Sequence, residues 1–340
     1  MFLTKGQPVF RLVSIVFFAL LAARGQAACT GTDLLAQMAA PERESLYARA
    51  NSQPNAQGLL WRAERGDEVV HIMGTLHTAD PRHEQNMTIL APLIARADTI
   101  LLEMGDGDEK RLQAKMAREP GLAFIIDGPT LPDLLSPDEW TQLRAAMSER
   151  GVPGFMVAKM QPWMAMLTLG MSACVFKETS QGKRGLDQMI IERANALGNP
   201  AQALEDYDTS MYLFTDYAED EMLDMLRLTL ALEDVDPDAQ YSTLVEAYFR
   251  EDVRVIWEFG IAQTLANPQG MSEAEILAEY ARLEHTMMNK RNQAWMDRIY
   301  ATSAKGEVFV AAGALHLPGA FGVLNLLEQA GFSLTRVPLQ

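Results

Sequence analysis

Two mostly apolar runs along the chain end in glycine and are followed by the same short motif. Residues 69–74 lead through GTLH to His77, and residues 307–313 lead through GALH to His316. β-Branched and aromatic residues favour strands, and a glycine marks the turn after each run. The pattern therefore predicts two buried strands that each present a histidine just beyond the carboxyl end.

Further strands are predicted between these two motifs. A helix over 87–97 and a strand over 99–102 lead to Glu103, and a shorter apolar segment over 201–204 leads to Glu205. A crossover of this length makes consecutive strands parallel, so their carboxyl ends face the same edge of the sheet. Ligands of open α/β sheets bind at that edge. We therefore expect both glutamates near the histidines.

The remaining pattern completes an α/β fold. A hairpin is expected around Gly66, and apolar positions at helical spacing fill most of 109–150 and 208–304. The sequence predicts one domain over 29–340, with a mixed, largely parallel central sheet flanked by helices. A helical subdomain is expected as an insertion at about 208–304.

The N-terminus has the order of a secretory signal peptide. Lys5 and Arg11 precede an apolar run over 12–23, and small residues follow as far as Ala28. A membrane span needs about 20 apolar residues, so this shorter run favours a cleaved signal over 1–28. We expect a mature chain that has no transmembrane span and is periplasmic or secreted.

Two cysteines, Cys29 and Cys174, are the whole cysteine content of the chain. In an oxidising compartment such a pair favours a disulfide. A lipid on Cys29 is the less favoured alternative, because Gln26 stands where lipoprotein signals usually carry an aliphatic residue.

Composition narrows the range of partners. The net charge is -16, from 29 basic and 45 acidic residues, and phosphate contacts need clustered Lys and Arg, so nucleic acid is not expected.

The stretch 155–176 is rich in methionine. Core packing is a better interpretation of it than a copper-type thioether site.

Two histidines and one or two carboxylates at one sheet edge suit a divalent metal ion. An ion with an open coordination position activates water and polarises a carbonyl, which points to hydrolysis. A carboxylate that does not ligate the ion could accept the water proton, and Arg291 could stabilise an oxyanion if the last long helix passes over the site. The chain has no HExxH, Gly-x-Ser-x-Gly, GxxxxGK[ST] or GxGxxG motif. Haem ligation by His77 or His316 remains open.

The paired Gly-x-x-His motifs, the strand ending in Glu103, and the segments 185–206, 291–299 and 308–337 resemble the TraB/PrgY/GumN family, which includes the Tiki proteins. The resemblance implies a fold similar to the erythromycin esterase and ChaN-like group. It also implies a metal-dependent peptidase activity that favours manganese or cobalt. The site residues it implies are His77, Glu103, His316 and Arg291, with Glu205 in the Leu-Glu segment.

We therefore expect an exported metal-dependent hydrolase, a peptidase, that binds manganese, cobalt or zinc through His77, His316 and Glu103. Glu103, Glu205 and Arg291 are the expected catalytic residues, and the substrate is a peptide or a small molecule. The alternative is a periplasmic protein that binds a peptide, haem or polysaccharide-related ligand without turnover. A homodimer remains open, as does the place of His83, which would either line the pocket or lie on the surface.

Overall fold

A computed structural model describes residues 29–339 except 214–216, 233–234 and 269; the predicted signal segment 1–28 lies outside the described residues. One six-stranded sheet has the order β4-β3-β5-β2-β1-β6. Its strands are β1 (Leu60–Arg65), β2 (Glu68–Thr75), β3 (Thr99–Leu102), β4 (Gln202–Ala203), β5 (Val308–Gly313) and β6 (Ser333–Val337).

The four strands that precede the predicted site residues are parallel to one another. β5 pairs with β2 on one side and with β3 on the other, and β3 pairs with β4. β1 is antiparallel to β2 and β6, and the β1–β2 turn lies at Gly66, where the sequence predicts a hairpin. The prediction of a mixed, largely parallel sheet in an α/β fold is therefore confirmed.

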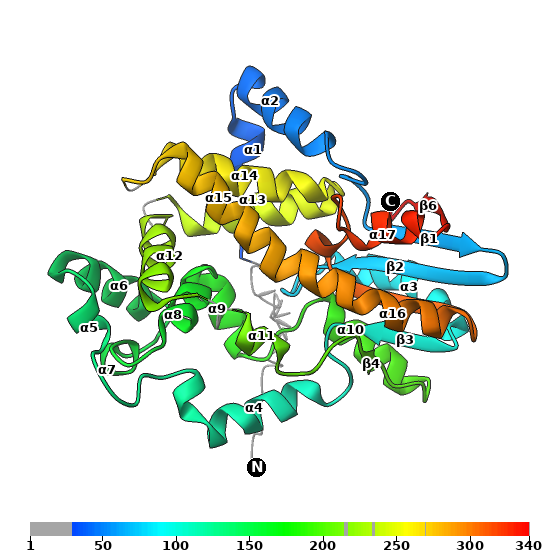
Figure 1. The fold of residues 1–340 in the computed structure, drawn as a ribbon, viewed down its shortest axis with the longest axis horizontal. Helices are drawn as coiled ribbons and strands as arrows, with labels where there is room; N and C mark the ends of the chain where they lie inside the picture. The colour runs from blue at the N-terminus through cyan, green and yellow to red at the C-terminus, as the bar shows by residue number, and fades with distance from the viewer. Residues whose placement is uncertain (1–28, 214–216, 233–234, 269, 340) are drawn as a thin grey trace, which may run out of the picture.

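Helices cover both faces of the sheet (Figure 1). The longer helices are α2 (Ala40–Asn51), α3 (His83–Arg96), α4 (Asp108–Arg118), α6 (Pro137–Glu149), α8 (Pro162–Leu169), α9 (Ala173–Ser180), α10 (Leu186–Ala196), α12 (Glu219–Ala231), α13 (Pro237–Phe249), α14 (Val253–Ala266), α15 (Glu273–Glu284), α16 (Lys290–Ser303) and α17 (Val323–Gln329). Single turns form α1 (Leu34–Gln37), α5 (Leu131–Leu134), α7 (Gly154–Val157) and α11 (Thr209–Tyr212).

Two hydrophobic cores hold these layers together. On one face of the sheet, Ile94 of α3, Ile190 of α10 and Tyr248 of α13 pack with Phe309 of β5. On the other face, α16 and α17 pack through residues such as Trp295 and Leu327 against Val310 and its neighbours. The central strand β5 is buried on both faces, as its uninterrupted apolar sequence requires.

A third core lies in a helical lobe beside the sheet (Figure 1). It contains apolar residues of α5 to α8, of the chain between these helices and of α12, among them Leu143, Met160, Leu169 and Leu226. Within the predicted helical region 208–304, α12 packs in this lobe, whereas α13 and α16 cover the sheet. Met160 is buried in the core, and Met164 and Met166 pack against it, which agrees with the packing interpretation of the methionine-rich stretch.

One helix boundary differs from the sequence prediction. α3 begins at His83 rather than at residue 87, because the turn that precedes it folds directly into the first helical residues. α17 begins at Val323, several residues after Pro318. The intervening chain makes a 3₁₀ turn over Ala314–His316 and passes Gly319 at φ +98°, a left-handed conformation that a helix cannot contain.

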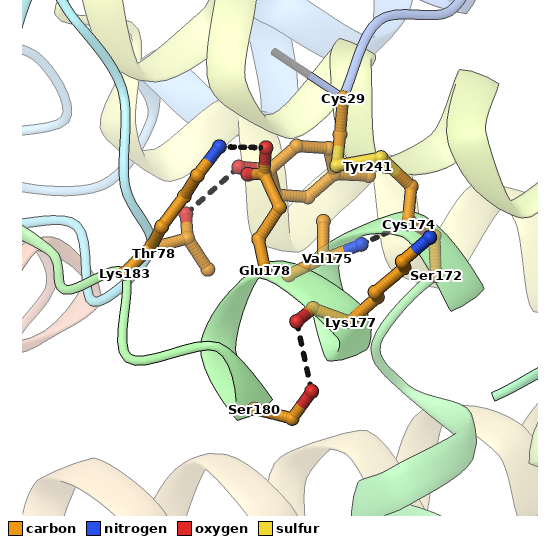
Figure 2. The surroundings of a disulfide bond; sticks show 10 residues. All are labelled: Cys29, Thr78, Ser172, Cys174, Val175, Lys177, Glu178, Ser180, Lys183 and Tyr241. Carbon is orange, nitrogen blue, oxygen red and sulfur yellow. Dashed lines mark hydrogen bonds and ion pairs between the residues drawn. A yellow bond between two sulfur atoms is a disulfide. The ribbon is translucent and has the colours of Figure 1, made fainter. Parts of the chain in front are cut away.

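Cys29 and Cys174 form a disulfide, which confirms the predicted pairing and leaves no free thiol on Cys29 (Figure 2). It connects the segment before α1 to α9. Within the described residues, none of the helices has the length and apolar character needed to cross a membrane.

Candidate functional site

The turns after β2 and β5 begin at the same level of the sheet, because Thr75 is paired with Gly313. The N–H of Gly313 donates to Oε1 of Glu103 at 2.6 Å. A Cβ on Gly313 would lie 3.0 Å from Nε2 of His77 and 3.3 Å from that same Oε1. The glycine therefore leaves open the space that His77 and Glu103 share.

His316 approaches this carboxylate from the 3₁₀ turn after β5. Its Nε2 lies 3.8 Å from Oε1 of Glu103. Only 7% of the His316 side chain is exposed, whereas 65% of the His77 side chain is exposed. The structure thus brings both histidines to one glutamate, with His316 buried and His77 open to solvent.

Arg291 lies among these groups because α16 passes over the sheet edge. Its Nη2 donates to Oε2 of Glu103 at 2.6 Å, and its Nε donates to Oε2 of Glu205 at 3.0 Å. Nη1 donates to Nε2 of His316 at 3.2 Å. Glu205 also accepts a hydrogen bond from Nε1 of Trp295 at 3.0 Å. Glu205 therefore holds Arg291 in place.

The charge of Glu103 is stabilised by its surroundings. Burial alone would raise the pKa of this carboxyl, but the positive charges around it and the Gly313 N–H outweigh burial and lower the pKa to about 2. Glu103 is therefore an ionised acceptor at neutral pH.

Each histidine is held through Nδ1 by an oxygen. Nδ1 of His77 donates to Oδ2 of Asp187 at 2.8 Å, and Oγ1 of Thr75 donates to the other oxygen of Asp187 at 2.6 Å. Nδ1 of His316 lies 2.6 Å from Oδ1 of Asn292. The amide nitrogen of Asn292 donates to two carbonyl oxygens, so its oxygen is the acceptor for His316. Nε2 of His77 is therefore left for a ligand, whereas Nε2 of His316 accepts from Arg291, a contact that an ion bound there would replace.

The two rings differ in their affinity for protons. The charge of Asp187 raises the pKa of His77 to about 9, in spite of an opposing effect of desolvation. Burial lowers the pKa of His316 to about 4. At neutral pH His316 is neutral, with its Nε2 lone pair toward Arg291, whereas His77 is protonated. An ion at Nε2 of His77 must therefore displace a proton.

Sequence reasoning missed Asp187, Asn292 and Thr75 as parts of the site. Thr75 and Asn292 stand beside or within the motifs already noted, and Asp187 follows a glycine in the segment 185–206. His83 is buried, and its Nε2 donates to the carbonyl oxygen of Thr78. The surface alternative for His83 is therefore wrong, because α3 begins at this residue and turns the ring inward.

The donor set of the site suits a divalent ion. It consists of two imidazole nitrogens and one ionised carboxylate, which are the groups found in metal sites of the zinc and manganese type. In each imidazole the other ring nitrogen is held by an oxygen, as is usual for ligating histidines. Within the described residues, however, no three such side chains are already spaced as ligands of one ion. Arg291 lies between Glu205, Glu103 and His316, and His77 approaches from the open side.

Two cavities adjoin the site at Glu205. One has a volume of about 570 Å³ and is lined by Arg291, Trp295 and Leu213 among others. The second has about 520 Å³, is polar, and includes Gly105 and Arg111. There is therefore space beside the site for groups larger than water.

Fold and site together define an α/β protein that gathers two histidines, two glutamates and an arginine at the carboxyl edge of a largely parallel sheet. The chain belongs to the TraB/PrgY/gumN family, whose sequence model matches residues 59–336. Neither a characterised protein nor a solved structure matches the chain significantly.

Proposed function

We propose that this protein is an exported metal-dependent hydrolase that acts on peptides, with a divalent ion held by His77, His316 and Glu103. The observation that carries the proposal is the arrangement of the two rings. Asp187 and Asn292 hold the Nδ1 atoms, so Nε2 of each ring lies near the same ionised carboxylate. Manganese, cobalt and zinc all accept such donors.

A bound ion would supply an activated water and a polarised carbonyl. Glu103 keeps its negative charge at neutral pH and its two oxygens face different groups, one toward the histidines and one toward Arg291. Arg291 offers a fixed positive charge for the oxygen that becomes negative during hydrolysis. Glu205 keeps this guanidinium in place. The exposed edge of His77 leaves the site open to a substrate.

The choice of peptides rests on family membership and on space. The two cavities that Glu205 helps to line provide room beside the site for parts of a peptide chain. Export is supported by the N-terminal pattern and by the disulfide, since structural disulfides persist in oxidising compartments.

The test begins with the mature chain loaded separately with manganese, cobalt or zinc. Bound metal is measured by elemental analysis and cleavage by mass spectrometry of a peptide library. His77→Ala and His316→Ala should each lose metal and cleavage while keeping the fold. His285→Ala, which changes an exposed histidine of the helical region, is the matched control. Tight capture of a peptide or of haem without products would contradict the hydrolase proposal and show that the protein is a binding protein.

A further inference from the structure

Figure 2 shows the surroundings of the disulfide, which include Thr78, the residue after His77, and Lys183, which precedes the Asp187 segment. Both cysteines are partly exposed. Two sets of contacts hold the His77 turn. The first support starts from the Cys174 side of the disulfide, and the second support starts from the Cys29 side.

The first support begins at Cys174 in α9. Oε1 of Glu178, one turn further along this helix, accepts a hydrogen bond from Nζ of Lys183 at 2.6 Å (Figure 2). The chain then passes directly beneath the His77 turn, where a Cβ on Gly185 would lie 2.2 Å from the carbonyl carbon of His77. Two residues later it supplies Asp187 to the imidazole. α9 is therefore linked to the segment that carries Asp187.

The second support begins at Cys29. The segment after it lies on α13, because the N–H of Leu34 donates to Oγ1 of Thr243 at 2.8 Å and Asp33 pairs with Arg250 at 2.7 Å. From the same helix, the hydroxyl of Tyr241 donates to Oγ1 of Thr78 at 2.9 Å (Figure 2).

A second hydroxyl of α13, that of Tyr248, donates to the carbonyl oxygen of Gly74 at 2.9 Å. α13 therefore holds the chain on both sides of His77. The disulfide joins the segment that lies on α13 to the helix that leads to Asp187.

We propose that the Cys29–Cys174 disulfide is a redox-dependent clamp that positions His77 in the site. Its closure oxidises two thiols to one S–S bond, and the two electrons and two protons pass to a disulfide oxidant, which becomes a dithiol. A dithiol reductant reverses the step. The bond joins residues 145 positions apart. Without it the two supports are tied only by noncovalent contacts, so the His77 turn opens more often.

One consequence is that a chain still in a reducing compartment has a loosened site. The catalytic arrangement is then completed only after export, when an oxidant closes the bond. This consequence rests on the proposed function, whereas the positioning of the turn does not.

The test compares hydrogen exchange of the full mature chain in the oxidised form, after reduction by a dithiol, and after reoxidation. Exchange should become about tenfold faster or more at 76–78 and 183–187 on reduction and return on reoxidation. The amides of the β1–β6 pair are the reference: a rise there reports the loss of global stability, and only a further rise at 76–78 and 183–187 reports the loosened turn. Unchanged exchange at both segments, with the fold retained by circular dichroism, would overturn the proposal.

Two variants sharpen the test. C29S/C174S should exchange like the reduced protein and ignore the reductant. Lys183→Met removes the contact with Glu178 while the disulfide stays intact, so exchange should rise at 183–187 alone. If Lys183→Met leaves that segment unchanged, the first support is wrong.

Binding of cobalt, measured by calorimetry in both redox states, separates this proposal from the proposed function. Weaker binding after reduction supports the clamp, and equal affinity in both states contradicts its action on the site. If the oxidised protein binds no ion and cleaves no peptide while the exchange response is seen, the hydrolase proposal fails and the clamp stands.

Discussion

Glu103 and His316 approach to 3.8 Å, although one follows β3 and the other follows β5. The same oxygen of Glu103 accepts the N–H of Gly313, the first residue of the motif that ends in His316. One carboxylate thus touches the backbone of a Gly-x-x-His turn and lies beside its histidine. Because β5 lies between β2 and β3, this carboxylate also lies close to His77, which follows β2.

Gly313→Ala should abolish activity while leaving the fold intact. Its φ is -49°, which alanine adopts without strain, but the new methyl group would occupy the space between His77 and Glu103. Gly170→Ala is the control, because its Cβ would meet only backbone oxygens at 3.6 Å, an ordinary contact. Peptide cleavage, metal binding and thermal unfolding of both variants are the measurements. Full activity in Gly313→Ala would show that the shared space has no role.

Asp187→Asn should weaken metal binding about 10- to 100-fold, the usual effect of losing a carboxylate behind a ligating histidine. The neutral amide removes the negative charge that orients the His77 ring through Nδ1. Asp67→Asn makes the same charge change in the exposed β1–β2 turn and should leave affinity unchanged. The measurement is manganese affinity by calorimetry. If both variants bind equally well, Asp187 does not position His77 for an ion.

Removing the disulfide should also lower global stability. C29S/C174S opens a link across 145 residues, and loss of a native disulfide typically costs about 2–5 kcal/mol. Chemical denaturation of the variant against the oxidised wild type measures the free energy of unfolding. Equal values would mean that the disulfide does not stabilise the native state.

Stability should fall in mild acid because of buried His83. Burial lowers the pKa of His83, with smaller opposing effects from the hydrogen bond to Thr78 and from the charges of Asp80 and Asp187. The unfolded chain takes up a proton near pH 6.5 and the folded chain does so only at lower pH. The contribution of neutral, buried His83 to the free energy of unfolding is therefore complete above about pH 6.5. It is lost as the pH falls below that value, by up to about 1.4 kcal/mol per pH unit.

His83→Gln isolates this effect. Glutamine can still donate to the carbonyl oxygen of Thr78, which accepts from His83 at 3.0 Å, but it does not titrate. Denaturation of the metal-free proteins between pH 5 and pH 8 should show a shallower pH dependence for the variant. Parallel curves for variant and wild type would contradict the prediction, since other histidines contribute equally to both.

Local pattern was sufficient for much of the fold. Apolar runs ending in glycine predict β2 and β5, and the 99–102 and 201–204 runs predict β3 and β4. A pair of cysteines in a chain that is expected to be exported predicts the disulfide. These features depend on side-chain type and short-range spacing, which are properties of the sequence itself. The convergence of His77 and Glu103 also follows from a general rule, that parallel strands share a carboxyl edge.

Tertiary structure alone decided which side chains complete the site. Long-range packing of α10, α13 and α16 against the sheet decides two features of the site. It places β5 between β2 and β3, and it brings Asp187 and Asn292 to the two rings. The same is true of the bond between Glu205 and Arg291 and of the burial of His83. No spacing in the sequence encodes these contacts, because each partner is brought in by a different helix whose position is set by the hydrophobic face it buries.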